Sequence, residues 1–179
     1  MRALTNALRN KSARLNTVQS IRERLEHLPQ RGKLTWIGLR TERRGTIEVV
    51  TQAELKAGRG LLGDHRAMRD PAPNAKRQVT LLQHEHLAVI ASVLGKASVQ
   101  PEQLRRNLLI SGINLLALKD RRFYIGEVML AGTGPCHPCT RMEENLGEGG
   151  LNAVRGHGGI TARVLSDGFI HLGDEVFAT

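Results

Sequence analysis

Aromatic residues are scarce in this sequence. They make up 3% of the 179 residues, with one Trp, one Tyr and three Phe. Proteins that bind single-stranded nucleic acid stack successive bases on aromatic rings. The composition therefore disfavours that class of protein, although a partner held by charge alone remains compatible with it.

Long apolar runs and cysteines are also few. No apolar run approaches the roughly 18–20 residues that a membrane-spanning helix needs. The N-terminus has no compact apolar stretch followed by a small-residue cleavage site. We therefore expect a cytoplasmic protein that does not bind membranes. Two cysteines are too few for a disulfide framework, which favours metal ligands or redox thiols.

Positive charge, by contrast, is abundant. The chain has 26 Lys and Arg against 17 Asp and Glu, a formal net charge of +9. This excess favours an anionic partner such as nucleic acid, a membrane surface or a phosphorylated small molecule. Many basic residues lie in residues 1–30, where apolar residues at helical spacing predict an amphipathic helix over Thr17–Leu28. We expect this extension to dock on the domain formed by residues 31–179, or on a second subunit.

Short runs of β-forming residues follow the extension. They are Lys33–Leu39, Thr46–Thr51, Gln78–Leu82, Leu108–Ile110, Arg122–Leu130, Ile160–Leu165 and Phe169–Phe177. Two helices interrupt them, over His84–Leu94 and after Thr140, and the pair Asp167-Gly168 predicts a hairpin. Strands do not alternate with crossover helices as in a Rossmann or thioredoxin fold. The pattern predicts a mainly β fold, a closed or nearly closed antiparallel barrel with a few short helices.

Both cysteines lie in segment 132–143, which is rich in glycine and proline and leads from a strand into a helix. Thr140, followed three residues later by Glu143, has the pattern of a capping box with Thr140 as the N-cap. Cys139 would then lie beside unpaired amides at the positive end of the helix dipole, which favour its thiolate. Such a thiolate suits a soft metal, sulfur transfer or thiol–disulfide exchange.

Other uses of the cysteine pair fit the sequence less well. A zinc site lacks a second ligand pair, because His84 and His86 are two residues apart and do not share a helix face. Covalent haem attachment needs histidine where Thr140 stands, and a thioredoxin-like dithiol needs a βαβ context that is missing. A purely structural role, in which both cysteines are small buried apolar residues, stays an alternative.

Glycines in two other segments favour backbone packing over chemistry. Gly60–Asp64 lacks the Gly-Lys-Ser/Thr ending of a phosphate loop and predicts a tight turn. Gly156, Gly158 and Gly159 predict a close approach of two backbone segments.

Taken together, seven segments resemble the MOSC domain family, named for the C-terminal part of molybdenum-cofactor sulfurases and also found alone. They are Gly60–Asp64, Lys76–Leu81, Leu104–Gly112, Tyr124–Gly126, Cys136–Cys139, Gly158–Ile160 and Gly173–Val176. They occur in family order within residues 31–179. The resemblance implies a β-rich barrel that binds molybdenum cofactor.

The resemblance also implies roles for particular residues. The family's molybdenum-ligating cysteine matches Cys139, the implied metal ligand and catalytic residue, and does not match Cys136. The related amidoxime-reducing proteins bind the cofactor through an arginine and an asparagine that match Arg105 and Asn107. A guanidinium suits the cofactor's phosphate because it is a planar, permanently charged fork. Further candidates for cofactor or anion contacts are Lys76, Arg77, Thr133, His137, His65 and Arg66.

By the same resemblance, the activity is reduction of small N-hydroxylated molecules at a cysteine-ligated molybdenum centre. A separate reductase would supply electrons, because the sequence has no flavin, haem or iron–sulfur motif. The amidoxime-reducing proteins have a further N-terminal domain that contributes cofactor contacts and has no counterpart here. We therefore expect either a homodimer whose second subunit closes the site, or looser binding with exchange. Pyridoxal phosphate is not an expected cofactor.

Two other functions are compatible with the residues. In a sulfur or cofactor carrier, Cys139 would form a persulfide or pass cofactor to and from a delivery protein. In a basic module for nucleic acid or acidic protein, binding would weaken steeply with salt and would not need Cys139.

Overall fold

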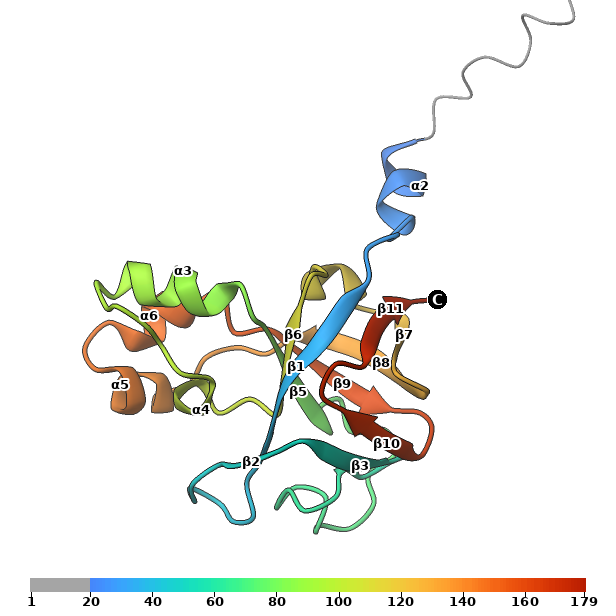
Figure 1. Ribbon diagram of the computed structural model, residues 1–179, viewed down its shortest axis with the longest axis horizontal. Helices are drawn as coiled ribbons and strands as arrows, with labels where there is room; N and C mark the ends of the chain where they lie inside the picture. The colour runs from blue at the N-terminus through green and yellow to red at the C-terminus, as the bar shows by residue number, and fades with distance from the viewer. Residues whose placement is uncertain (1–19) are drawn as a thin grey trace, which may run out of the picture.

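The computed structural model describes residues 20–179 (Figure 1). The strands are β1 (Gly32–Leu39), β2 (Glu48–Val50), β3 (Gln52–Lys56), β4 (Gly60–Leu61), β5 (Val79–Gln83), β6 (Leu108–Ser111), β7 (Arg122–Ile125), β8 (Val128–Pro135), β9 (Ile160–Val164), β10 (Gly168–His171) and β11 (Glu175–Ala178). The helices are α2 (Ile21–Glu26), α3 (His86–Val93), α4 (Pro101–Leu104), α5 (Arg141–Leu146), α6 (Gly150–Val154) and the 3-10 helix η2 (Leu115–Leu118). Within these residues, no helix has both the length and the apolar character needed to cross a bilayer.

Seven strands close into a barrel. Their hydrogen-bonded order is β11-β7-β8-β9-β5-β6-β1, and β11 pairs again with β1, while β2 adds to β1 outside the ring. The mainly β barrel predicted from the sequence is confirmed. The prediction that all barrel strands pair antiparallel is wrong for one pair, because β5 and β6 run parallel. The long connection between them, which carries α3 and α4, provides the crossover that parallel pairing requires.

A second, smaller sheet has the order β10-β3-β4. The hairpin predicted at Asp167-Gly168 is therefore wrong, because β9 pairs with β8 and β5 whereas β10 pairs with β3. The Asp167 carboxylate instead accepts hydrogen bonds from the Ala57 backbone N–H and the Lys56 ammonium. The turn residues thus join two sheets.

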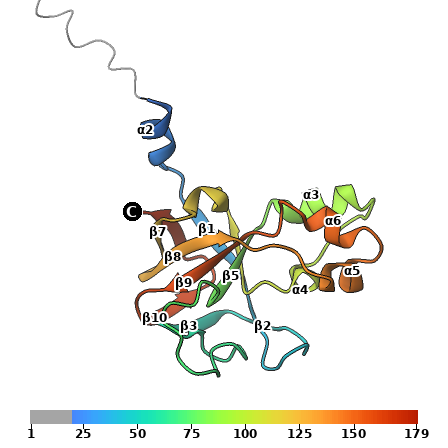
Figure 2. The same ribbon diagram turned by 180° about the vertical axis from the view of Figure 1, so that it is seen from behind.

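The barrel interior forms the larger of two apolar cores. Alternate side chains of β8 point inward, as the burial pattern of the strand shows, and Phe123 is among the largest fully buried residues. Helices α3 to α6 gather on one side of the barrel (Figures 1 and 2). They share a second core with the barrel strands, which includes Leu82, Ile90, Leu104, Leu109 and Met142. Segments at the ends of α4 and α5 in this helical layer carry part of the candidate site.

The N-terminal helix α2 projects away from the barrel (Figures 1 and 2). A capping box between Ser20 and Glu23 starts it, so it is shorter than the predicted Thr17–Leu28, of which residues 17–19 lie outside the described part. Ile21 is 79% exposed and Leu25 is 70% exposed. No residue of α2 is buried, but Arg121 donates hydrogen bonds to the carbonyls of Leu25 and Glu26, and Leu28 packs against the barrel core. The extension therefore contacts the domain at its C-terminal end, and docking of its exposed apolar face on a second subunit stays a prediction.

Candidate functional site

One cavity of about 480 Å³ collects basic side chains from five separate segments of the chain. Its lining comprises Arg40, Arg43, Arg44, His65, Arg66, Arg69, Arg77, Arg105, Arg106, Cys139, Arg141 and Met142. No acidic side chain from residues 20–179 is part of this lining. The cavity is therefore a strongly positive recess with a cysteine at its wall.

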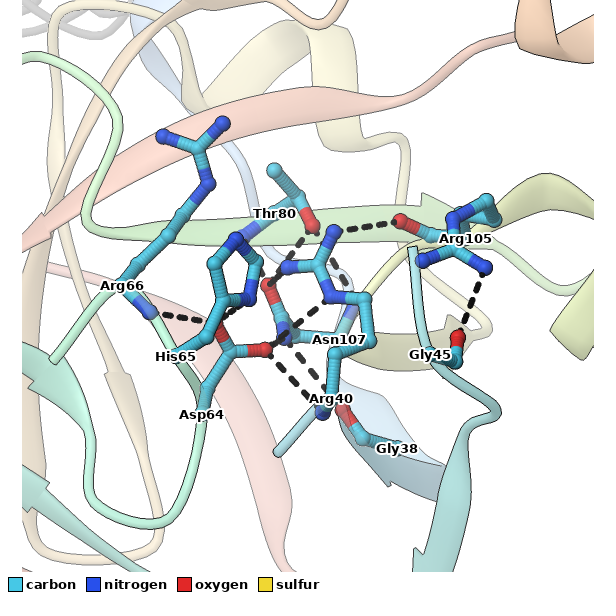
Figure 3. A network of polar contacts seen from close by, with 9 residues as sticks. All are labelled: Gly38, Arg40, Gly45, Asp64, His65, Arg66, Thr80, Arg105 and Asn107. Atoms are coloured by element: carbon cyan, nitrogen blue, oxygen red, sulfur yellow. Dashed lines mark hydrogen bonds and ion pairs between the residues drawn. The ribbon is translucent and has the colours of Figure 1, made fainter. Parts of the chain in front are cut away.

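The centre of the cavity rests on a buried polar network (Figure 3). The Asp64 carboxylate accepts hydrogen bonds from Arg40 Nε at 3.0 Å and from Asn107 Nδ2 at 2.8 Å. The Asn107 carbonyl oxygen accepts hydrogen bonds from Thr80 Oγ1 at 2.8 Å and from an Arg40 guanidinium nitrogen at 3.2 Å. The backbone N–H of Arg66 also donates to Asp64, at 3.0 Å. The network joins the end of β1, the loop after β4 and the start of β6.

Asp64 stays charged in this buried position. Burial by itself would raise its pKa, but the Arg40 charge and the hydrogen bonds from Arg66, Asn107 and Arg40 together hold the pKa below its ordinary value. Arg40 and Asp64 thus form a buried ion pair whose side chains are 8% and 3% exposed. The predicted turn at Gly60–Asp64 therefore also supplies a carboxylate, a role that the sequence analysis missed.

Arg105 lies at the end of α4 in a left-handed backbone conformation, with φ of 53°, which is uncommon for a residue other than glycine. Its carbonyl accepts a hydrogen bond from Arg40, and its guanidinium donates to the carbonyl of Gly45 at 3.1 Å. Burial first, and then the charges of Arg40 and Arg141, lower the pKa of Arg105. The structure therefore places this predicted anchor at the cavity wall among other cations.

Arg106 holds the cysteine loop in place from beneath. It is 4% exposed, and its guanidinium donates to three backbone carbonyls, those of Leu104 (2.7 Å), Gly158 (2.8 Å) and Cys136 (3.3 Å). Gly158 packs so closely that a Cβ there would overlap the Cys136 carbonyl. The close backbone approach predicted for this glycine segment is thus present.

The two cysteines occupy different environments. Cys136 is 3% exposed, its backbone N–H donates to the Gly159 carbonyl at 2.8 Å, and its sulfur accepts a hydrogen bond from Arg77 at 3.4 Å. Cys139 is exposed and lines the arginine cavity. Both are free thiols. Of the two, only Cys139 lines the cavity; its role as the metal ligand in preference to Cys136 stays a prediction.

The capping box predicted for Thr140 and Glu143 is wrong. Helix α5 does begin after Thr140, but the Thr140 side chain makes no capping hydrogen bond. The Glu143 carboxylate instead accepts hydrogen bonds from the backbone N–H groups of Gly149 at 2.7 Å and Leu151 at 2.8 Å. Those bonds lower the pKa of Glu143. They tie α5 to the start of α6 and take the place of the capping contact that was expected within α5.

The structure separates the other candidate residues. Arg77, His65 and Arg66 line the arginine cavity together with Arg105 and Cys139. Lys76 and Thr133 line a different cavity of about 410 Å³, which also contains Arg122 and Arg163. His137 is exposed and does not belong to the lining of the arginine cavity. Asn107 is buried beneath that cavity, where its amide contacts protein groups.

Sequence reasoning missed several arginines of the cavity. Arg40 follows the last residue of β1, Arg43 and Arg44 lie in the turn before β2, and Arg69 lies in the loop before β5. The adjacent pair Arg43-Arg44 between two β runs was a usable signal, because a solvated turn has no need of consecutive basic residues. Arg40 and Arg69 carry no such local signal.

A protein-family model for the MOSC domain matches residues 57–177. The chain belongs to the MOSC domain family. This family is associated with molybdenum-cofactor binding. The match confirms the resemblance inferred from the seven segments, while the domain start at residue 31 stays a prediction. A search of curated proteins finds no match to the sequence.

Solved structures show the same fold at low sequence identity. The YuaD protein from Bacillus subtilis is 20% identical, with a TM-score of 0.69, and the match covers 84% of this MOSC chain and 97% of that chain. YiiM from Geobacillus stearothermophilus is 13% identical, with a TM-score of 0.66 over 83% of this chain and 75% of that chain. YiiM from Escherichia coli is 16% identical, with a TM-score of 0.62 over 82% of this chain and 69% of that chain.

Proposed function

We propose that this MOSC domain binds molybdenum cofactor in the arginine cavity and reduces small N-hydroxylated compounds. The observation that carries the proposal is the placing of an exposed cysteine, Cys139, on the wall of a cavity lined by nine arginines. A cysteine thiolate is a ligand that suits molybdenum, and guanidinium groups suit the phosphate of the cofactor. Cys139 therefore suits the molybdenum of the cofactor, and the arginines suit its phosphate.

Each part of the cavity has a defined task under this proposal. Cys139 provides the sulfur ligand, while Arg105 and Arg141 hold the phosphate beside it. Arg106 fixes the cysteine loop through the three carbonyls that it binds. Asn107 acts from beneath by holding Arg40 and Asp64 in place, so its effect on the cofactor is one of positioning.

When bound, the cofactor supplies two-electron redox chemistry and oxygen-atom transfer. The net reaction takes an N–OH group, two electrons and two protons to an N–H group and water. A separate electron-donating protein delivers the electrons, and a second subunit closes the open side of the cavity.

The test is metal and pterin analysis of the chain purified from a host that makes the cofactor. We expect about one molybdenum per chain, loss of molybdenum in Cys139→Ser, and retention in Cys136→Ala. The exposed position of Cys139 means that its serine variant should fold normally, which circular dichroism checks. Equal loss of metal in both variants contradicts the ligand assignment.

Two outcomes would favour the alternative functions. A persulfide on Cys139 in metal-free protein, detected by mass spectrometry, would favour a sulfur carrier. Nucleic-acid binding that weakens steeply with salt and survives Cys139→Ser would favour a basic binding module.

A further inference from the structure

The cavity carries more positive charge than one cofactor phosphate neutralises. Arg40 pairs with Asp64 and Arg141 pairs with Glu144 at 3.0 Å. The other seven arginines of the lining have no acidic partner within residues 20–179. A phosphate monoester contributes about 1.5 to 2 negative charges at pH 7. With that phosphate alone, several like charges would stay close together and partly desolvated, which is unfavourable.

The arginines fall into two clusters. The Cys139 cluster consists of Arg105, Arg141 and Cys139, near α4 and α5. The loop cluster consists of Arg66, Arg69 and Arg77, on the connection between β4 and β5. Arg66 and Arg105 project from opposite sides of the buried Arg40 network (Figure 3).

Arg105 of the Cys139 cluster and Arg66 of the loop cluster are influenced by different neighbouring charges. Besides burial, the cations that lower the pKa of Arg105 are Arg40 and Arg141, with Cys139 acting in the other direction. For Arg66, burial comes first and the cations are Arg77, Arg40 and Arg69. Arg40 acts on both Arg105 and Arg66, and Asp64 already pairs with it. Both clusters are positive, so neither neutralises the other, and each can attract an anion of its own.

The loop cluster is held in a fixed backbone. The Arg59 guanidinium donates to the carbonyls of Ala67 and Arg69, at 3.3 Å and 3.2 Å. The Gln78 amide donates to the carbonyls of Ala72 and Pro73, at 2.9 Å and 3.3 Å. These bonds hold the backbone at residues 67–73, within the segment that presents the arginines to the cavity.

Arg66 has an unused donor in this setting. Its Nε atom is buried and has no hydrogen-bond partner among the described residues. A buried guanidinium nitrogen without an acceptor is costly, and most buried polar groups in proteins are satisfied. An anion bound at the loop cluster would supply the missing acceptor.

We propose that the cavity binds two phosphate groups at once, that of the cofactor at the Cys139 cluster and that of the substrate at the loop cluster. The inference rests on the proposed function and deepens it, because it makes the substrate a phosphorylated N-hydroxylated compound such as a nucleotide. A second phosphate on the cofactor itself would have the same chemistry, and the experiment separates the two sources.

The experiment compares N-hydroxycytidine with its 5′-monophosphate as substrates of the molybdenum-loaded chain, with reduced methyl viologen as electron donor. The two probes differ only in the phosphate. We expect kcat/KM to be roughly tenfold or more higher for the monophosphate, as one charge-assisted contact predicts. The double variant Arg66→Gln, Arg69→Gln should bring this ratio close to one while molybdenum content stays that of the unmodified chain.

The matched control is Arg155→Gln, an exposed arginine outside the cavity lining, which should keep the ratio. A ratio near one in the unmodified chain overturns the proposal. So does loss of molybdenum in the double variant with an unchanged ratio, because the loop cluster would then hold cofactor. Pterin analysis that finds a nucleotide joined to the cofactor assigns the second phosphate to the cofactor and likewise overturns it.

Failure of the proposed function gives a different result. If the purified chain contains neither molybdenum nor pterin, the cofactor proposal fails, and the metal-free chain is titrated calorimetrically with inorganic pyrophosphate. Binding weakened roughly tenfold in the double variant but not in Arg155→Gln supports the loop cluster as a phosphate site. Equal binding by all three proteins overturns it.

Discussion

The arginines at the floor of the cavity differ from those at its rim in what their guanidinium groups contact. The floor arginines are Arg40 and Arg106, and the rim arginines are Arg43, Arg44 and Arg69. The floor arginines are 7% and 4% exposed and bind protein groups: Asp64 and Asn107 for Arg40, backbone carbonyls for both. The rim arginines are exposed, and within residues 20–179 their side chains have no acidic partner.

The difference shows that one residue type serves two purposes in one cavity. A buried guanidinium whose donors are satisfied by the protein stabilises the fold and shapes the site, and removing it leaves carboxylates or carbonyls without partners. An exposed guanidinium without a partner contributes little to stability and is available to a ligand. Substitutions should therefore separate folding from binding.

The largest effect should come from breaking the buried ion pair. Arg40→Met leaves Asp64 buried without its cation, which should lower the free energy of unfolding by about 3–5 kcal/mol. Urea denaturation followed by circular dichroism measures this. The double variant Arg40→Met, Asp64→Leu should recover part of the loss, because no uncompensated charge remains. A loss below about 1 kcal/mol in the single variant would contradict the assigned role of the pair.

Removing the second floor arginine should cost less. Arg106→Gln leaves carbonyls of the cysteine loop unsatisfied, with an expected loss of about 1–3 kcal/mol. The loop should also become more mobile, so we expect faster proteolysis near Cys136 in the metal-free protein. If Arg106→Gln has the stability and cleavage pattern of the unmodified chain, the cysteine loop does not depend on Arg106.

The pH dependence of stability tests the charge on Asp64. Because its pKa is lower in the folded protein than in the unfolded chain, its contribution is fully present above the unfolded pKa of about 4 and is lost as pH falls through the folded pKa. The unmodified chain should therefore lose its advantage over Asp64→Asn as pH falls below about 4. Thermal unfolding of both proteins between pH 7 and pH 3 measures the difference. If the stability difference between the two proteins stays constant from pH 7 to pH 3, the lowered pKa of Asp64 does not contribute to stability.

Rim substitutions should have the smallest effect on stability. Arg43→Gln and Arg44→Gln should change the free energy of unfolding by no more than about 0.5 kcal/mol. A slight increase is compatible with the removal of like-charge repulsion. Phosphate binding to the same variants should weaken and become less sensitive to salt, because fewer cations attract the anion. A loss of several kcal/mol in either variant would end the distinction between floor and rim.

Much of the barrel was predictable because each strand has a local signal. Short β-forming runs located β1, β5, β6 and β9. The extent of the paired strands was less predictable: the runs Arg122–Leu130 and Phe169–Phe177 each contain two strands separated by a turn. Pairing partners depend on which edges meet in space, which explains why β10 joins β3 and the expected hairpin is absent.

For the candidate site, the sequence by itself identified the cysteine loop and named Cys139, Arg105, Arg77 and Arg66 as candidates, and all four line one cavity. Cys139, Arg105 and Arg77 lie in segments that resemble the MOSC family, and Arg66 lies just after one of them. Tertiary structure alone decided that Arg40 is a buried partner of Asp64, that Asn107 lies beneath the cavity, and that Glu143 caps α6. It also decided that Lys76 faces a different cavity from its neighbour Arg77. The physical reason is that burial and hydrogen-bond partners depend on segments far apart in the chain, which no local spacing records.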